Sequence, residues 1–315
     1  MKRVSSRTAS WSPAGLSPRS SNTPGTELHK PPGDNWTVVD VGESDTTVYR
    51  RDNLYAKCCA PSGVADLSAE RDRITWLAGT GLPGATVVDW LESPMPSEGG
   101  SALSSHGESA PPSTGATPPP WRGASAGGAL ASSGGACLIT SAVPGVPGDA
   151  LPPESYERAM ESLGRVFRYL HSLTDCPFER SLESVVATAT DVVRRGAVNP
   201  DFLTDEWRLL EPSELLAQVV AERPYIEEDL EPVVCHGDAC LPNIFFDPET
   251  LEVTGLIDLG RLGLADRYAD LALTTTQLHD EWSTDPAPFL QAYGLPTPDP
   301  RRLHFHRLLD PLTWG

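Results

Sequence analysis

Short apolar runs separated by polar turns dominate the first half of the chain. Residues 54–59, 86–90 and 137–140 are such runs, and they predict strands. Residues 64–78 instead repeat apolar side chains at helical intervals, which predicts one helix after the first of these strands. This order predicts a small lobe over residues 35–142 that is built on an antiparallel sheet.

The second half of the chain is mostly helical by the same criterion. Residues 156–173 place apolar side chains on one face, and residues 182–193 continue this spacing up to a helix stop at 194–196. The Pro-rich residues 296–300 introduce a last short helix. We therefore predict an α+β fold with a larger, mainly helical lobe over residues 143–315. No apolar run approaches the length of a membrane span, so we expect a soluble protein.

Two segments have a composition that does not favour a packed core. Residues 1–34 are rich in Ser, Pro and Thr. No apolar stretch of signal-peptide length follows their basic residues, so we interpret this segment as a disordered tail or as the result of an early start codon. Residues 93–135 contain 33 Pro, Gly, Ala or Ser in 43 positions and only three charged residues. This composition predicts a low-complexity insertion between two strands. An insertion is tolerated there because lengthening a loop costs little conformational entropy.

The candidate chemistry lies in the motif that begins at His236. Phosphoryl transfer requires a carboxylate that accepts a proton from the attacking hydroxyl, plus an amide and a second carboxylate that hold magnesium on the phosphates. Asp238, Asn243 and Asp258 supply these groups, and the interval from Asp238 to Asn243 matches the catalytic loop of protein kinases. A predicted hairpin over residues 244–257 returns Asp258 to the side of Asn243. The alternative is a solvated loop, because Asp and Asn are common in turns.

Lys57 is the candidate cation for the phosphates. It is the only lysine after Lys30, in a chain where arginine outnumbers lysine 21 to 3. A lysine supplies the compact point charge that a guanidinium cannot. Glu70, near the beginning of the predicted helix, is its natural partner, although glutamate is also common in a first helical turn. Residues 41–49 form a possible turn whose amides would cover phosphates.

Together these segments resemble the aminoglycoside phosphotransferase family, and within it the branch that acts on the 3''-hydroxyl of streptomycin. The resemblance covers most of residues 36–92 and 136–315. It is carried by residues 55–58, 65–73, 137–140, 143–147, 233–243 and 254–272.

The resemblance implies a two-lobed, protein-kinase-like fold that uses ATP and Mg²⁺ to phosphorylate an antibiotic hydroxyl. By this resemblance Lys57 would bind the phosphates and Glu70 would hold Lys57. Asp238 would be the catalytic base, and Asn243 and Asp258 would bind magnesium.

The resemblance also implies further nucleotide contacts in the small lobe. Gly42 and Ser44 would belong to the turn that covers the phosphates. Thr140, Ser141 and Ala142 would form the adenine hinge through their backbone atoms.

Acceptor contacts follow from the resemblance at four positions of the large lobe. These positions are Arg261, Asp280, Glu281 and Asp310. Carboxylates suit the protonated guanidino or amino groups of such an acceptor. Each acid is equally compatible with an ordinary exposed position.

The charge agrees with a cationic small-molecule partner. The formal net charge is −19, and residues 151–315 contain 29 Asp or Glu against 13 Arg, a difference of −16. Such a field repels nucleic acid and anionic membranes and attracts polycations such as aminoglycosides. Solubility alone is an equally good explanation of an acidic surface. The sequence does not indicate an oligomeric state.

The remaining polar residues near the motif favour structural roles. We expect His236 to pack behind the catalytic loop, and Asp266 and Asp270 to cap or pin the large lobe. Cys235 and Cys240 lack the spacing of a zinc site, so no structural zinc is predicted. The six cysteines, without a secretion signal, suit reduced thiols in the cytoplasm.

We therefore predict an ATP-dependent small-molecule O-phosphotransferase that works by direct in-line transfer. One alternative is a related kinase that acts on another antibiotic or on an alcohol metabolite. The other is a catalytically silent protein that binds a nucleotide or an antibiotic, if the turn or the insertion disturbs the phosphate geometry.

Overall fold

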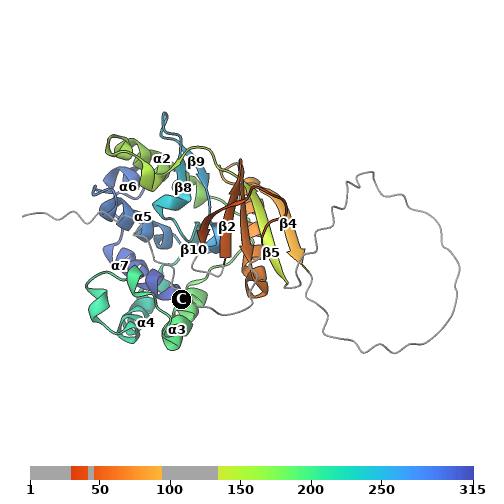
Figure 1. Cartoon of the computed structure of the whole chain (residues 1–315). Helices are drawn as coiled ribbons and strands as arrows, with labels where there is room; N and C mark the ends of the chain where they lie inside the picture. The colour runs from red at the N-terminus through yellow and green to blue at the C-terminus, as the bar shows by residue number, and fades with distance from the viewer. Residues whose placement is uncertain (1–29, 42–45, 94–133) are drawn as a thin grey trace, which may run out of the picture.

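The computed structural model describes residues 30–41, 46–93 and 134–315, and it has the mixed α+β architecture that the sequence predicts (Figure 1). The predicted tail and insertion lie almost wholly outside these residues. Within them, no helix is long and apolar enough to cross a membrane.

The first part of the chain forms a five-stranded antiparallel sheet with the strand order β1-β2-β3-β5-β4. All three predicted strands are present, and the last two are neighbours as expected. The strands are β1 (Thr37–Val41), β2 (Thr46–Arg51), β3 (Leu54–Cys59), β4 (Val87–Ser93) and β5 (Gly135–Ser141).

A single helix, α1 (Val64–Ala78), covers one face of this sheet. It buries Leu67, Ile74 and Leu77, at the helical spacing that predicted it, in a cluster that also contains Leu138 of β5. Burial of three such side chains contributes several kcal/mol, at about 1.5–3 kcal/mol each.

Side chains alternate between the two faces of β3, as the pleat of a strand requires. Cys58 faces away from α1 and joins a second apolar cluster with Tyr49 and Ile139. Cys58 lies directly opposite Cys137 of β5, and the two form a disulfide. The prediction of six reduced thiols is therefore wrong for this pair. The two cysteines are 79 residues apart in the sequence, and they come into contact only because β3 pairs with β5. The sequence alone therefore gave no reason to pair them.

The second part of the chain is mainly helical, and the predicted helices are present. The one predicted over residues 156–173 ends at Leu170, and the stop predicted at 194–196 is confirmed by Gly196, which follows the helix with a left-handed φ of 64°. The helices are α2 (Tyr156–Leu170), α3 (Leu182–Arg195), α4 (Pro212–Glu228), α5 (Tyr268–Asp280), α6 (Ala287–Tyr293) and α7 (Pro300–Leu309).

Two small sheets lie between the five-stranded sheet and the helices (Figure 1). One is three-stranded, with the order β6-β8-β9, and the other pairs β10 with β7. They contain the short strands β6 (Val146–Pro147), β7 (Pro232–Cys235), β8 (Ile244–Phe246), β9 (Val253–Leu256) and β10 (Gly263–Asp266). The predicted hairpin is the β8–β9 pair.

The hydrophobic core is continuous between the two parts. Leu77 of α1 belongs to the same buried cluster as Phe246, Leu256 and Phe289 from the second part. A second cluster joins α3, α4 and α7 with Leu312, which lies in the short helical segment η8 (Asp310–Thr313). The lobe boundary at residues 142 and 143 stays a prediction.

Candidate active site

A cleft of about 940 Å³ lies between the five-stranded sheet and the helical part. One end is lined mainly by apolar side chains. These are Val48, Ile74, Leu138, Phe245, Leu256 and Ile257. Another part of the cleft is lined by residues 199, 202, 261 and 313–315, among which Arg261 and Phe202 both contact Trp314. Lys57, Glu70, Asp238 and Asp258 also line the cleft, so the predicted polar residues meet at this place.

Lys57 projects from β3 and bridges the two parts of the molecule. Its Nζ lies 2.9 Å from Oε2 of Glu70 in α1 and 3.1 Å from Oδ1 of Asp258. Burial alone would lower the pKa of Lys57, but the two carboxylates outweigh burial and raise it. The lysine is therefore a fixed positive charge in the lining of the cleft. The predicted Lys57–Glu70 pair is present in the structure.

Asp238 lies in the loop that follows β7, and Asn243 orients it. Nδ2 of Asn243 donates to Oδ2 of Asp238 at 2.9 Å and to its backbone O at 3.1 Å. Burial raises the pKa of Asp238, and the nearby charge of Asp258 adds to this effect. A carboxylate with a raised pKa in a cleft can accept a proton from a hydroxyl group.

The loop that contains Asp238 is held from behind by Asp270 of α5. The completely buried carboxylate of Asp270 accepts the backbone N–H of His236 at 2.7 Å and that of Gly237 at 2.8 Å. Nε2 of His171 lies 3.1 Å from the same carboxylate. These contacts agree with the pinning role predicted for Asp270, and His236 is fully buried behind the loop as expected.

Gly237 is required at its position for two reasons. Its φ of 82° is in the left-handed region, and a side chain there would collide with the backbone of Arg261. The tight turn therefore brings Asp238 and Arg261 to the same part of the cleft.

Asp258 reaches the cleft because the β8–β9 hairpin turns the chain back. The N–H of Ile257 donates to the backbone O of Asn243 at 3.0 Å, which places the two segments side by side. Asp258 has a left-handed φ of 57° and exposes 47% of its side chain. An oxygen-rich group exposed inside a cleft suits a hard cation such as Mg²⁺.

The predicted hinge and phosphate turn are only partly described. Thr140 and Ser141 line the cleft, whereas the backbone N–H of Ala142 donates to the backbone O of Asn53 at 2.8 Å. Gly42 and Ser44 lie outside the described residues. The nucleotide contacts proposed for these residues stay predictions.

The four predicted acceptor residues are not gathered at one place. Arg261 lines the cleft, and Nη1 of Arg261 lies 3.7 Å from Oδ1 of Asp310. Asp280 and Glu281 are exposed at the end of α5, and neither lines the cleft. Their roles in acceptor binding stay predictions.

Several cleft residues carried no recognisable signal in the sequence. Asn199 and Phe202 come from the connection between α3 and α4, and Thr313 and Trp314 come from the segment after α7. The terminal stretch drew attention only because of Asp310. An aromatic residue in a loop has no spacing rule that would identify it.

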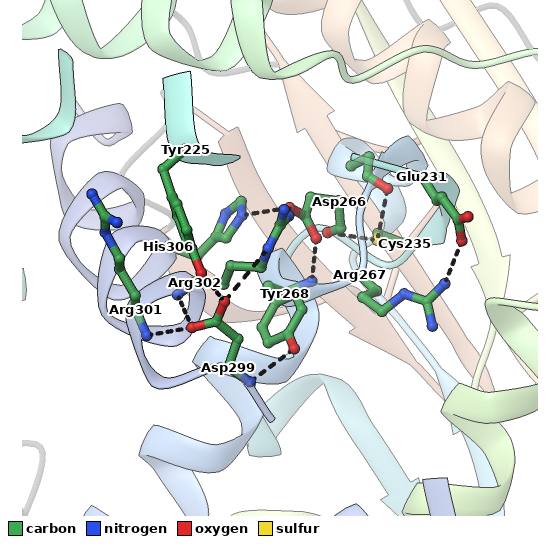
Figure 2. Close-up of polar contacts among 11 residues, drawn as sticks. Tyr225, Glu231, Cys235, Asp266, Arg267, Tyr268, Asp299, Arg301, Arg302 and His306 are labelled. Atoms are coloured by element: carbon green, nitrogen blue, oxygen red, sulfur yellow. Dashed lines mark hydrogen bonds and ion pairs between the residues drawn. The ribbon is translucent and has the colours of Figure 1, made fainter. Parts of the chain in front are cut away.

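A buried polar network fixes α7, which leads into that terminal segment (Figure 2). Nη1 of Arg302 donates to Oδ2 of Asp266 at 3.1 Å, and Nε2 of His306 lies 3.4 Å from the same oxygen. Asp299 caps the helix and also accepts from the hydroxyl group of Tyr225 in α4 at 2.7 Å. The network ties α7 to β10 and α4, in agreement with the supporting role predicted for Asp266.

The cleft between the sheet and the helical part combines the pair of Lys57 and Glu70 with Asp238, Asn243 and Asp258. This combination is typical of a kinase-like phosphotransferase. The chain belongs to the phosphotransferase enzyme family, whose sequence model matches residues 35–306. The resemblance found in the sequence is thus confirmed.

Individual relatives support the same assignment. The chain is 43% identical over 295 residues to the streptomycin 3''-kinase of Streptomyces griseus, which covers 90% of this chain and 94% of that protein. It is 37% identical to the aminoglycoside 3'-phosphotransferase of Streptomyces fradiae, with 89% and 96% covered. The structure of the aminoglycoside phosphotransferase APH(3'')-Id from Streptomyces rimosus, in complex with ADP and streptomycin, matches with a TM-score of 0.70. That match has 38% identity and covers 89% of this chain and 93% of the other.

Proposed function

We propose that the protein is an ATP-dependent O-phosphotransferase whose acceptor is streptomycin, at the 3''-hydroxyl group. The observation that carries the proposal is the meeting of Lys57, Asp238 and Asp258 in one cleft. The similarity to a streptomycin 3''-kinase and to a structure that contains ADP and streptomycin supports the choice of substrates.

In this proposal the apolar end of the cleft takes the adenine base and Lys57 binds the phosphates. Glu70 holds Lys57 at 2.9 Å, so the lysine does not have to be ordered when the nucleotide arrives. Thr140, Ser141 and Ala142 would form the hinge.

Asp238 would orient the acceptor hydroxyl and accept its proton during in-line transfer. The hydrogen bond from Asn243 Nδ2 fixes the direction of one carboxylate oxygen. Because the raised pKa of Asp238 makes it a better proton acceptor, its position and its chemistry agree. Typical general-base contributions are about 10²–10⁴-fold in rate.

Asn243 and Asp258 would hold magnesium. The amide of Asn243 uses its nitrogen toward Asp238, which leaves the oxygen for a metal, and the carboxylate of Asp258 is half exposed in the cleft. Oxygen donors of this kind are those that Mg²⁺ prefers. When bound, the ion would neutralise charge on the transferred phosphoryl group.

We also propose a cytoplasmic location, because a kinase works where ATP is present. The Cys58–Cys137 disulfide is unusual for a reducing compartment. Thiol counting by alkylation under denaturing conditions, immediately on cell lysis, tests this point, because Cys59, Cys176 and Cys235 are buried in the folded protein. Four alkylated cysteines would mean that the bond exists in the cell, and six would mean that it is reduced there.

The proposed function is tested by the release of ADP from purified protein with ATP, Mg²⁺ and a panel of aminoglycosides. We expect a signal that depends on streptomycin, and NMR of the product should show phosphate on the 3''-oxygen. Asp238→Ala should lower kcat by at least about 10²-fold while ATP still binds. Glu249→Ala, in the exposed turn of the β8–β9 hairpin, is the control. A panel without any streptomycin-dependent signal would contradict the proposal.

A further inference from the structure

We propose that Phe202 and Trp314 form an aromatic wall that binds a guanidinium group of the acceptor and so selects acceptors of the streptomycin type. This inference rests on the proposed function, because it assigns one wall of the same cleft. It adds two residues for which the sequence had suggested no role.

The two rings come from distant parts of the chain and meet in the lining of the cleft. Phe202 ends the short helical segment η4 (Pro200–Phe202), and Trp314 follows η8. Their ring centroids lie 6.0 Å apart, with an angle of 60° between the planes. Phe202 is 43% exposed, although it lines the cleft. A large apolar side chain that is exposed in a cleft is typical of a ligand-binding surface.

The wall is held in place by the surrounding backbone. The N–H of Phe202 donates to the backbone O of Asn199 at 3.2 Å, and the side chain of Asn199 accepts from the N–H of Asp201 at 3.0 Å. Nε of Arg208 donates to the backbone O of Pro200 at 2.8 Å. Nη2 of Arg195 donates to the backbone O of Gly315 at 3.1 Å, which ties the end of α3 to the segment of Trp314. Little ordering is therefore needed when an acceptor binds.

The protein already stacks a guanidinium on this wall. The guanidinium carbon of Arg261 lies 3.4 Å from the ring centroid of Trp314. The same guanidinium donates to the side chain of Thr313 at 2.9 Å and to its backbone O at 3.2 Å. The indole ring is thus positioned to face a planar cation, while Phe202 remains exposed for a second one.

The charges nearby allow a second cation in spite of Arg261. Asp310 lies 3.7 Å from Arg261, and Asp238 and Asp258 line the same cleft. Asp258 is already paired with Lys57. Asp310 and Asp238 are therefore the carboxylates that offset the charge of Arg261. Acids alone would attract any polycation, whereas the flat face of an aromatic ring discriminates by shape.

Guanidinium and ammonium groups differ in how they bind such a wall. A guanidinium is planar and weakly hydrated, so it stacks on aromatic faces, whereas an ammonium group is compact and strongly hydrated. Streptomycin carries guanidino groups on its inositol-derived ring, and many other aminoglycosides carry only amino groups. The wall therefore favours acceptors of the first kind.

The test compares Phe202→Leu with Phe202→Tyr in steady-state kinetics. Phe202→Leu keeps apolar volume but removes the ring, so we expect the KM for streptomycin to rise about 3- to 30-fold. Phe202→Tyr keeps the ring and should stay within about twofold of the wild type. The KM for ATP should not change in either variant. Leu209→Ala, on the same connection but outside the cleft and 85% exposed, is the matched control.

The outcomes separate this inference from the proposed function. If the wild type phosphorylates streptomycin and Phe202→Leu has an unchanged KM, the wall is refuted and the function stands. If the wild type phosphorylates no aminoglycoside, the proposed function fails. Calorimetric titration with streptomycin in the presence of ADP then tests whether the aromatic wall binds the guanidinium group. Weaker binding by Phe202→Leu would support it, and equal or absent binding by both proteins would overturn it.

Discussion

Replacing Asp270 with Asn should damage both stability and turnover, because this buried carboxylate accepts three hydrogen bonds. Two of them come from the backbone N–H groups of His236 and Gly237, at 2.7 and 2.8 Å, on different carboxylate oxygens. An asparagine offers one oxygen, and its NH₂ group would face the other backbone donor. Either orientation of the amide therefore leaves one backbone N–H without an acceptor.

The expected magnitude follows from these contacts. A buried donor without a partner costs about 1–3 kcal/mol, and the bonds that remain lose the strength that the charge of the acceptor provides. We expect the free energy of unfolding to fall by about 3 kcal/mol. Because Gly237 directly precedes Asp238, a displaced loop also misplaces the proposed base, and a shift of about 1 Å costs about 10²-fold in kcat.

The assay is urea unfolding combined with steady-state kinetics of Asp270→Asn. His279→Gln, on the exposed end of the same helix, is the control and should match the wild type in both measurements. A loss of less than about 1 kcal/mol in the unfolding free energy would refute the account of Asp270. A large loss of stability with normal kcat would mean that the loop keeps its position without the carboxylate.

Three further predictions concern the disulfide, the insertion and acid stability. Cys58→Ser should lower the unfolding free energy by about 4 kcal/mol without reductant, because the bond closes a loop of 79 residues, and dithiothreitol should abolish the difference. Replacing residues 94–134 by Asn-Gly should keep folding and kcat, measured by circular dichroism and ADP release, because Ser93 and Gly135 are direct partners across β4 and β5. The urea midpoint should fall as the pH drops below about 4, and this acid dependence should be weaker in Asp270→Asn.

The sign of the acid effect follows from two buried carboxylates. Burial opposes ionisation of Asp270 and Asp266, but their partners outweigh burial and lower both pKa values. His171, His236 and the N–H of Gly237 have this effect on Asp270. A group whose pKa is lower in the folded protein stabilises it above the unfolded pKa, about 3.8 here, and that stability is lost as the pH falls through the folded pKa.

The sequence predicted those parts of the fold in which local pattern and final structure agree. The strand at 54–59 and the helix at 64–78 were found at the right places, since alternation and helical spacing both reflect one buried face. The hairpin predicted over residues 244–257 is the β8–β9 pair. The candidate residues Asp238, Asn243 and Asp258 could be proposed for the same reason, because short, local connections bring them together.

What could not be predicted depends on contacts between distant residues. Cys58 and Cys137 are opposite each other only because β3 pairs with β5 across the insertion. Phe202 and Trp314 approach each other only because α3, α4 and α7 share a cluster with the segment after α7. No local rule connects residues so far apart.

The residues proposed for the chemistry and those proposed for acceptor binding are held in place by different contacts. The proposed chemistry depends on short connections around β7, β8 and β9, which the buried carboxylate of Asp270 fixes from behind. The proposed acceptor wall depends instead on the packing of α3, α4 and α7, which the network of Asp266, Arg302 and Asp299 stabilises (Figure 2). Because Asp270, and not the aromatic wall, holds the loop of Asp238, substitutions in the wall should change the KM for the acceptor without changing the transfer step.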